Sequence, residues 1–318
     1  MSYSKIIGVG TYLPERTVSN DDLAKTVDTS DEWIVQRTGI SRRHIAAEGE
    51  TASSLAEHAA RQALQEAQVQ PEEIDLIIVA TATADKFFPS TACLLQARLG
   101  ITTCCIAFDV SAACSGFVYA LSIADQFIRS GAVKNALIVG TEVLSRITDW
   151  TDRRTCVLFG DGAGAFVLTA SEKPGILSST LHADGRQSEI LYINNTRAYP
   201  SPDANIQMKG KELFKFAINA AAALIRETLE INKITMDDID WLVPHQANER
   251  ITEALAKNLN FPIEKTISSI KEQANTSAAS IPLAFASGVN SGKIKRGQKV
   301  MLVGFGGGMT WGSILMVY

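Results

Sequence analysis

Long hydrophobic runs are absent from this chain of 318 residues. No apolar stretch approaches the roughly 20 residues that a membrane-spanning helix needs. Residues 1–5 lead directly into a strand-like apolar segment at residues 6–9, and not into a secretion signal. Hydrophobic residues make up 46% of the chain and charged residues 20%, as is typical of a soluble globular protein. We therefore expect a cytoplasmic protein that does not bind membranes.

Cysteine is also scarce, and its spacing fits no structural framework. The chain has five cysteines, an odd number, and none of them forms a Cys-x-x-Cys pair. This pattern favours neither a disulfide scaffold nor a zinc site, so we expect reduced thiols and no bound metal. Apart from Cys114, the cysteines are expected to be inert core residues: Cys93, Cys104, Cys105 and Cys156.

A basic excess and nucleotide-binding motifs are lacking as well. The formal net charge is −4, whereas nucleic-acid-binding proteins obtain much of their affinity from an excess of basic residues. Residues 160–164 and 304–308 are rich in glycine but match neither GxGxxG nor GxxxxGK(S/T). The sequence therefore predicts no nucleic-acid partner and no nucleotide phosphate site of those two kinds.

The chain does contain an internal repeat. Several segments recur at an offset of roughly 165 residues, which indicates a duplication. Only the first copy carries a cysteine, because Cys114 in one segment aligns with Ser280 in the other. The paired segments are residues 73–79 and 238–243, 111–114 and 277–280, and 136–140 and 300–304.

Short apolar segments alternate with amphipathic ones along the chain. This alternation predicts an α/β fold with two similar sheets and helices packed against and between them. Since no low-complexity linker is visible, we expect two tightly packed halves, residues 1–172 and 173–318. Expected strands span residues 76–80, 136–140, 156–159, 165–168, 241–243 and 300–303, and expected helices span residues 54–67, 115–130, 211–230 and 249–259.

Cys114 lies between an expected strand at residues 106–110 and an expected helix that begins near Ser115. Unpaired N–H groups and the dipole at a helix N-terminus favour a thiolate, the reactive form of cysteine. Small neighbouring residues leave the sulfur accessible. This position makes a nucleophile about as good an interpretation as an inert core cysteine.

Two further polar residues interrupt apolar surroundings. His245 ends an expected buried strand, and Asn275 begins a turn that the repeat aligns with Asp109 to Cys114. If the halves pack about a pseudo-twofold axis, these turns meet, and Cys, His and Asn share one site. Taken singly, His245 is better interpreted as a core histidine and Asn275 as a turn residue or helix cap. Their matching positions favour catalysis.

A run of three glycines, residues 306–308, lies shortly after the expected strand at residues 300–303. Consecutive glycines allow positive φ angles and let backbone N–H groups approach a bound oxygen, as an oxyanion hole requires. A glycine run alone is more often a tight turn, so it supports catalysis only together with the polar residues.

Together these motifs resemble β-ketoacyl-acyl carrier protein synthase III. This family, within the thiolase-like superfamily, holds the condensing enzymes that initiate bacterial type II fatty acid synthesis. The resemblance covers nearly the whole chain and implies a duplicated five-layer α-β-α-β-α fold, in agreement with the repeat. The matching segments are residues 8–14, 31–40, 112–117, 159–164, 244–248, 275–280 and 306–313.

The resemblance implies a decarboxylating condensation through an acyl-cysteine intermediate. Cys114 would take a short acyl group, usually acetyl, from acyl-CoA. His245 and Asn275 would then donate hydrogen bonds to the thioester oxygen of malonyl-acyl carrier protein as loss of CO2 creates an enolate. The N–H groups of Cys114 and Gly307 would form a second oxyanion hole. No metal or organic cofactor is implied.

A CoA site is implied by three residues of the same resemblance. Trp33 and Arg153 match positions that sandwich the adenine, and Arg37 matches one near the CoA phosphates. Stacking of an indole and a guanidinium on a flat purine is chemically apt. Without the resemblance, Trp33 would be interpreted as a helix–core contact.

Protein partners are also implied only by resemblance. Lys215 and Arg250 match basic positions at the tunnel mouth, and Lys257 extends that patch toward an acidic acyl carrier protein, although scattered lysines are usually just solvated. Phe88 matches a residue that reaches the acyl pocket of a partner subunit, so a homodimer is expected.

Competing enzyme classes explain fewer residues. A papain-like protease has Cys, His and Asn in this order, but its Cys-Gly-Ser-Cys-Trp context is missing here. A biosynthetic thiolase has a second cysteine where this chain has Gly304 and Phe305. A non-catalytic relative is expected to have lost one of the three site residues. A related acyltransferase of secondary metabolism with a different or longer primer stays an open alternative to acetyl-CoA priming.

Overall fold

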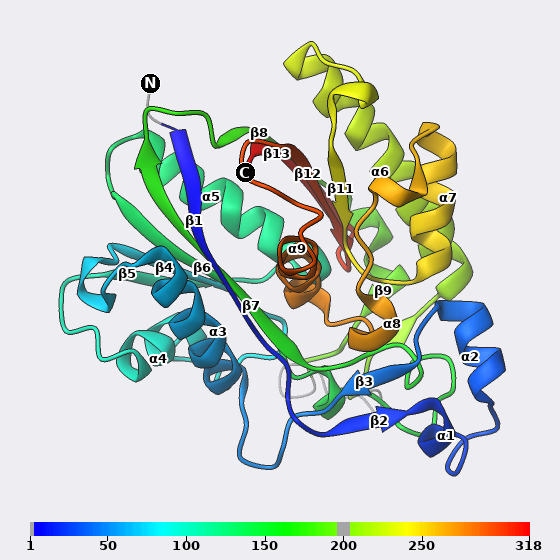
Figure 1. Cartoon of the computed structure of the whole chain (residues 1–318). Helices are drawn as coiled ribbons and strands as arrows, with labels where there is room; N and C mark the ends of the chain where they lie inside the picture. The colour runs from blue at the N-terminus through cyan, green and yellow to red at the C-terminus, as the bar shows by residue number, and fades with distance from the viewer. Residues whose placement is uncertain (1–2, 196–203) are drawn as a thin grey trace.

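Two β-sheets form the centre of the computed structural model, which describes residues 3–195 and 204–318 (Figure 1). Within these residues, the larger sheet has strand order β1-β7-β6-β4-β5 and the smaller has β11-β12-β13-β8. Each sheet joins a parallel pair to an antiparallel neighbour in the same order, which agrees with the repeat. The strands are β1 (Tyr3–Tyr12), β4 (Leu76–Ala80), β5 (Ile106–Val110), β6 (Asn135–Glu142), β7 (Gly162–Ser171), β8 (Ile176–Ala183), β11 (Trp241–Pro244), β12 (Lys299–Gly306) and β13 (Thr310–Val317).

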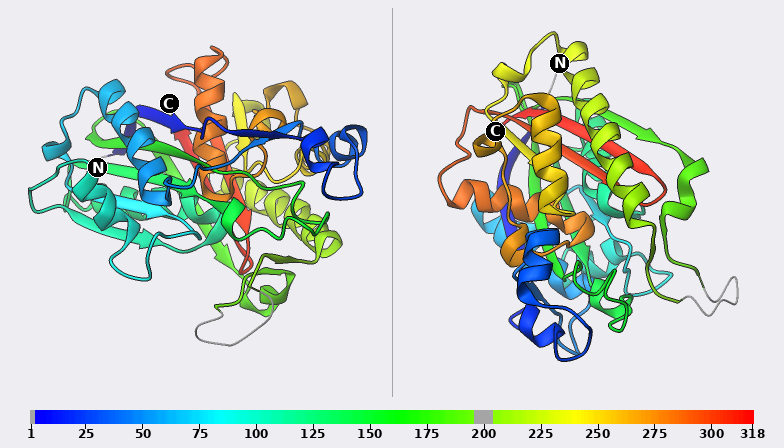
Figure 2. Two further views of the ribbon diagram at one scale, coloured as in Figure 1. Left: turned by 90° about the horizontal axis from the view of Figure 1, so that it is seen from below. Right: turned by 90° about the vertical axis from the view of Figure 1, so that its right-hand side faces the viewer.

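Helices cover the outer face of each sheet. On the larger sheet, α3 (Ala52–Ala67) begins at a capping box between Thr51 and Ser54 and buries an alanine-rich face against β1 and β7. The α4 helix (Thr91–Arg98) lies beside it. The smaller sheet is covered by α6 (Gly210–Asn232) and α7 (Glu249–Leu259), which lie in front of the strands in the right-hand view of Figure 2.

Two helices lie between the sheets, α5 (Gly116–Arg129) and α9 (Ser280–Asn290) (Figure 1). Their buried residues join a core that draws on both sheets. The ring of Phe166 in β7 makes edge contacts with Phe117 of α5 and Phe285 of α9, each at a centroid distance of 5.0 Å. The five layers confirm the predicted α-β-α-β-α architecture, and burial of this central layer holds the halves together.

Smaller elements close one end of the molecule, where they lie below the sheets in Figure 1. A two-stranded sheet, β2 and β3, lies next to the short helices α1 and α2, and α8 packs against β3. These elements are β2 (Thr17–Ser19), α1 (Asn20–Leu23), α2 (Asp31–Thr38), β3 (Arg42–His44), β9 (Leu191–Tyr192), β10 (Gln207–Met208) and α8 (Ile270–Gln273).

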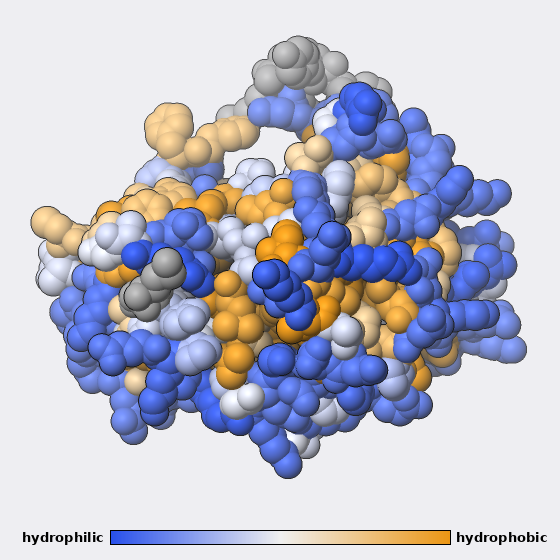
Figure 3. Space-filling view, turned by 90° about the horizontal axis from the view of Figure 1, so that it is seen from above, coloured by the Kyte–Doolittle hydropathy of each residue, from blue (hydrophilic) through white to orange (hydrophobic). Residues whose placement is uncertain are grey.

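The surface and the helices agree with the absence of long hydrophobic runs. Polar and charged residues predominate around the face shown in Figure 3, with hydrophobic residues gathered toward its middle. Within residues 3–195 and 204–318, every helix is too short or too polar to traverse a bilayer.

Some local predictions were wrong. Residues 156–159, expected as a strand, form turns, and only Phe159 makes an isolated bridge, to Asn275. Cys156 and Val157 are buried in a small cluster with residues of α1 and α2, Phe159 is buried in a second cluster, and Leu158 is partly buried, which explains the strand-like hydrophobicity of this segment. Of the four cysteines expected in the core, only Cys156 is buried, whereas Cys93 and Cys105 are half-buried and Cys104 is exposed; all five cysteines are free.

The repeat register also differs from the prediction at the turns before α5 and α9. Ala113 and Ser277 open the two 3-10 turns with nearly equal φ angles, 45° and 49°. Gly116 and Ser280 then begin the two helices. Ser280 therefore corresponds to Gly116, and the predicted pairing of Ser280 with Cys114 is wrong. Sequence identity favoured the wrong register, because residues 111–113 and 277–279 are both Ser-Ala-Ala, whereas the structural register pairs no identical residues in the two turns.

Candidate active site

Cys114 lies in the tight turn between β5 and α5, in the 3-10 turn Ala113–Ser115, with its side chain 6% exposed. Ser115 fixes this turn, since its hydroxyl donates to the carbonyl of Ala112 at 2.8 Å and bonds Thr310 of β13 at 2.8 Å. A Cβ at Gly306 would lie 2.7 Å from the Cys114 nitrogen. The end of β12 can therefore approach the cysteine only because residue 306 is glycine.

His245 directly follows β11 and is 2% exposed. Its Nδ1 atom lies 2.6 Å from the hydroxyl of Ser280, the first residue of α9. The ring of Phe305 makes an edge contact with the imidazole at 5.2 Å. Burial lowers the pKa of His245 to about 3, so the imidazole is neutral at physiological pH.

Asn275 lies between α8 and the turn before α9, and its backbone is bonded on both sides. Its N–H donates to the carbonyl of Leu158 at 2.9 Å, and its carbonyl accepts from Gly160 at 3.0 Å. The side-chain Oδ1 accepts from the Ser277 N–H at 2.9 Å. Because this bond engages the oxygen, the amide NH2 group is the part of Asn275 available to a ligand.

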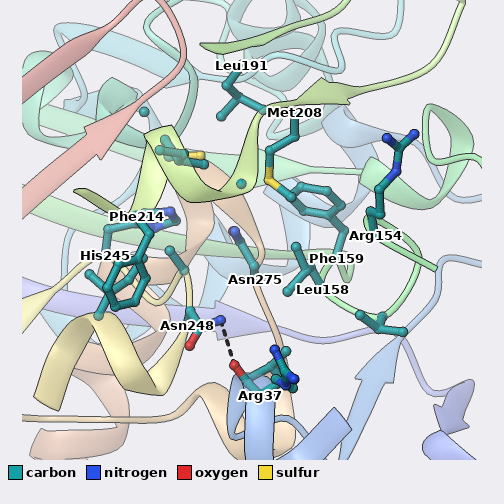
Figure 4. Close-up of a pocket in the computed structure, with 18 of the residues that line it drawn as sticks. Arg37, Arg154, Leu158, Phe159, Leu191, Met208, Phe214, His245, Asn248 and Asn275 are labelled. Carbon is teal, nitrogen blue, oxygen red and sulfur yellow. Dashed lines mark hydrogen bonds between the residues drawn. The ribbon is translucent and has the colours of Figure 1, made fainter. Parts of the chain in front are cut away.

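The three residues line one cavity of about 210 Å³. Figure 4 shows His245 and Asn275 near one another, with Arg37 farther along the same pocket. Asn248 also lines this pocket, and its side-chain amide donates to the Arg37 carbonyl at 3.1 Å. Most other lining residues are apolar, among them Leu191, Met208, Leu213, Phe214, Ile251 and Phe305.

The predicted CoA residues line the same cavity. Trp33 belongs to α2, and the guanidinium carbons of Arg37 and Arg153 lie 5.5 and 4.9 Å from the centre of its ring system. Arg153 also donates to the carbonyl of Asp28. The structure therefore brings an aromatic face and two cations to the cavity that holds Cys114.

Other predicted residues do not line this cavity. Gly307 adjoins the lining residue Gly306 but packs against the Leu191 carbonyl, 2.9 Å from where a Cβ would be. Phe88 is 85% exposed, on the segment between β4 and α4. The basic residues Lys215, Arg250 and Lys257 are exposed on α6 and α7, and the Arg250 guanidinium lies 5.8 Å from the ring centre of the lining residue Phe214.

A buried carboxyl near Cys114 was missed in the sequence. Glu142 ends β6, is wholly buried, and accepts from the Thr83 hydroxyl at 2.7 Å and the Ala82 N–H at 3.1 Å. Hydrogen bonding by Ser277 lowers the pKa of both Glu142 and Cys114. Burial raises the pKa of Glu142 to about 7. The signal in the sequence that could have revealed Glu142 is an acidic residue at the end of a fully apolar strand.

The Cys114 thiol differs from the predicted thiolate. Burial raises its pKa to about 12, the nearby Glu142 carboxylate adds to the rise, and the Ser277 hydrogen bond opposes it. Desolvation of the sulfur therefore outweighs the favourable turn at the helix N-terminus. In the resting protein, the cysteine is a protonated thiol at neutral pH.

Alkylation of Cys114 by iodoacetamide should consequently rise about tenfold per pH unit from about pH 6 to about pH 9, because only the thiolate reacts. Mass spectrometry of the Cys114 peptide would follow the reaction, with the exposed Cys104 as an internal reference. A plateau within this pH range would show that the thiol ionises near neutrality and contradict the expected profile.

Comparisons with known proteins identify the family of this chain. The family model for 3-oxoacyl-acyl-carrier-protein (ACP) synthase III matches residues 108–185, and the model for its C-terminal part matches residues 229–318. β-Ketoacyl-acyl-carrier-protein synthase III from Methylococcus capsulatus is 56% identical over 319 residues, which cover 99% of this chain and 99% of the relative. The chain belongs to the β-ketoacyl-acyl carrier protein synthase III family.

The fold of this chain matches solved structures of synthase III enzymes. The crystal structure of 3-oxoacyl-acyl-carrier-protein synthase III from Aquifex aeolicus VF5 has a TM-score of 0.95 and 51% identity, and the match covers 99% of this chain and 100% of that one. The priming β-ketosynthase of the R1128 polyketide pathway has a TM-score of 0.94 but only 37% identity, with 99% and 96% coverage. The higher identities favour a synthase of fatty acid synthesis over one of secondary metabolism.

Proposed function

We propose that this synthase condenses a short acyl-CoA with malonyl-acyl carrier protein and so initiates fatty acid synthesis. The products are 3-ketoacyl-acyl carrier protein, CO2 and CoA, and acetyl-CoA is the expected primer. One observation carries the proposal: Cys114, His245 and Asn275 line a single cavity. This cavity combines a buried thiol that can hold an acyl group with two neutral hydrogen-bond donors for a developing oxyanion.

In the first half-reaction, Cys114 Sγ attacks the thioester carbon of acyl-CoA. The bond from that carbon to the CoA sulfur breaks, the thiol proton passes to the departing sulfur, and the acyl group stays on Cys114. The N–H groups of Cys114 and Gly307 are the proposed donors to the tetrahedral oxyanion. The close approach of Gly306 to Cys114 supports this role for the next residue, Gly307.

In the second half-reaction, malonyl-acyl carrier protein loses CO2, and the electron pair of the broken bond becomes an enolate. His245 Nε2–H and the Asn275 amide donate to the enolate oxygen. The enolate carbon attacks the acyl carbon, and the bond to Cys114 Sγ breaks with its electron pair on the sulfur, which takes a proton from solvent to restore the thiol. A neutral imidazole, as the lowered pKa of His245 indicates, donates without protonating the carbanion. Loss of CO2 generates the carbanion that acts as the nucleophile, so the reaction needs neither a metal nor an organic cofactor.

The CoA moiety of the first substrate is proposed to bind at Trp33, Arg37 and Arg153. A purine inserted between the indole and the Arg153 guanidinium would replace their mutual contact at 4.9 Å with stacking on both faces. Arg37, on the same helix as Trp33, would then face the phosphates. The common cavity with Cys114 supports this assignment because the thioester has to reach the sulfur.

The acyl carrier protein is proposed to dock on the exposed basic residues Lys215, Arg250 and Lys257. They lie on α6 and α7, the helices that supply the lining residues Phe214 and Ile251. An acidic partner would be attracted to such a patch at the entrance. A cytoplasmic location is part of this proposal, and five free cysteines fit a reducing compartment.

We also propose a homodimer formed along β5. This strand is an edge of the larger sheet, and Ile106 is 43% exposed. Asp109 of β5 accepts from the backbone of Thr91 and Ala92 at 2.7 and 2.8 Å, which holds α4 and the segment with Phe88 beside the edge. An apolar edge strand is a template for pairing with another chain. Phe88 could then reach a partner's cavity.

A lysine at this edge should disrupt the dimer. Ile106→Lys is expected to raise the dimer dissociation constant by about tenfold or more, because burial of a charge opposes strand pairing. Sedimentation velocity would compare the mass with the 34.3 kDa of one chain. Ile263→Lys, at a site of similar exposure, 41%, is the control. A wild-type monomer, or equal effects of both variants, would rule out this interface.

The proposed reaction is tested by mass spectrometry of the intact protein after incubation with a panel of acyl-CoAs, followed by malonyl-acyl carrier protein. The expected results are an acetyl adduct on the protein and then a 3-ketoacyl carrier protein. An adduct formed only with branched or long acyl-CoAs would favour the specialised alternative. If no acyl-CoA labels the protein, the proposed function is wrong.

A further inference from the structure

Ser280 lies where a hydroxyl can control the catalytic imidazole. It is the first residue of α9, it is 1% exposed, and its Oγ lies 2.6 Å from His245 Nδ1. The N–H of Gln246 also points at this oxygen, at 3.4 Å. A backbone N–H can only donate, so the Ser280 oxygen accepts from Gln246 and keeps its own hydrogen available.

The hydrogen of the Ser280 hydroxyl is directed at His245 Nδ1. Within residues 3–195 and 204–318, the hydroxyl has His245 Nδ1 as its only hydrogen-bond acceptor. Donation to Nδ1 requires that this nitrogen be unprotonated, which leaves the ring hydrogen of a neutral imidazole on Nε2. His245 lines the cavity, so this tautomer supplies the N–H that the enolate needs.

The pseudo-symmetric position in the first half shows what this contact adds. Gly116 is the first residue of α5, as Ser280 is of α9, and a Cβ at Gly116 would lie 3.1 Å from the Cβ of Ala80 at the end of β4. His245 follows β11, the strand that corresponds to β4. The same helix-to-strand contact is therefore apolar in one half and a serine–histidine pair in the half that carries the histidine.

We propose that Ser280 is a positioning residue that holds His245 in the Nε2–H tautomer for enolate stabilisation. This inference rests on the proposed function for its kinetic consequence but not for the tautomer itself. Without the hydroxyl, both neutral tautomers become accessible. In the tautomer with an unprotonated Nε2, the nitrogen lone pair repels the enolate oxygen. Protonation of His245 also becomes easier, because no hydroxyl competes for Nδ1.

The tautomer is read directly by nitrogen-15 NMR of histidine-labelled protein. The chain has only four histidines, and His245→Gln assigns the signal. The wild type should show an unprotonated Nδ1 and a protonated Nε2, whereas Ser280→Ala should show a mixture. A wild-type Nδ1–H signal would overturn the proposal, even if the alanine variant failed to fold.

Kinetics separate positioning from a purely structural role. Ser280→Ala should lower the rate of malonyl-acyl carrier protein decarboxylation about tenfold, the effect of losing one buried hydrogen bond, while acetylation of Cys114 stays within about twofold. Ser280→Thr, which keeps a hydroxyl, should recover most of the rate. Ser287→Ala, on the same helix but away from the cavity, should match the wild type.

The results that would contradict the role of Ser280 differ from those that would contradict the proposed function. Equal loss of acetylation and decarboxylation, with His245 still a single Nε2–H tautomer, would make Ser280 structural and overturn the proposal. Undiminished decarboxylation in Ser280→Ala would do the same. A wild type that neither becomes acetylated nor decarboxylates malonyl-acyl carrier protein would instead reject the proposed function, and the NMR result would still stand.

Discussion

Cys114→Ala is expected to abolish the acyl adduct and to lower condensation by at least about 10³-fold, as loss of a covalent nucleophile does. Mass spectrometry of the intact variant after incubation with acetyl-CoA should show only the unmodified mass. Decarboxylation of malonyl-acyl carrier protein should persist, because His245 and Asn275 do not depend on the thiol for their hydrogen bonds.

Cys156→Ala is the matched control for this experiment. Cys156 is buried and free like Cys114 but does not line the cavity. The control should keep both the adduct and the condensation rate. An acyl adduct that survives Cys114→Ala would assign the nucleophile to another residue.

His245→Ala and Asn275→Ala are expected to have the opposite effects. Each should retain acetylation of Cys114 and lose about 10²–10³-fold in decarboxylation and condensation, the usual cost of removing one oxyanion donor. Single-turnover acetylation and CO2 release, measured separately, distinguish the two steps. The two losses should combine to less than their product, since both residues stabilise the same charge.

His182→Ala and Asn232→Ala serve as controls, because both side chains bond groups outside the cavity, Glu227 and Ser178 respectively. Both controls should behave like the wild type. If His245→Ala condensed at the wild-type rate, the enolate would have to be stabilised by other groups, and the proposed role of the pair would fail.

The sequence predicted the architecture because buried strands and helix faces leave strong patterns. The expected helix at residues 249–259 and the expected strand at residues 76–80 agree with α7 and β4 in the structure. The segment 156–159 shows the limit of such patterns: its side chains are buried without strand pairing. Hydrophobicity reports burial, whereas a strand also needs a free edge with which to pair.

The candidate site was only partly visible in the sequence. His245 stood out at the end of an apolar segment and Asn275 at the start of a repeated turn, and the structure brings both to the cavity of Cys114. Glu142 and Ser280 contact segments far from them in the chain, which no local pattern records. The raised pKa of Cys114 likewise depends on its burial in the folded protein. The sequence shows only that a helix starts beside Cys114, which would lower the pKa.

The small volume of the shared cavity favours one order of substrate binding and product release. Its volume of about 210 Å³ is below the roughly 300–1,000 Å³ typical of pockets that enclose a whole small ligand, so one thioester arm occupies it at a time. CoA has to depart before the carrier's arm can reach the acylated sulfur. Initial velocities should therefore follow a substituted-enzyme pattern, in which free CoA competes with malonyl-acyl carrier protein for the loaded enzyme.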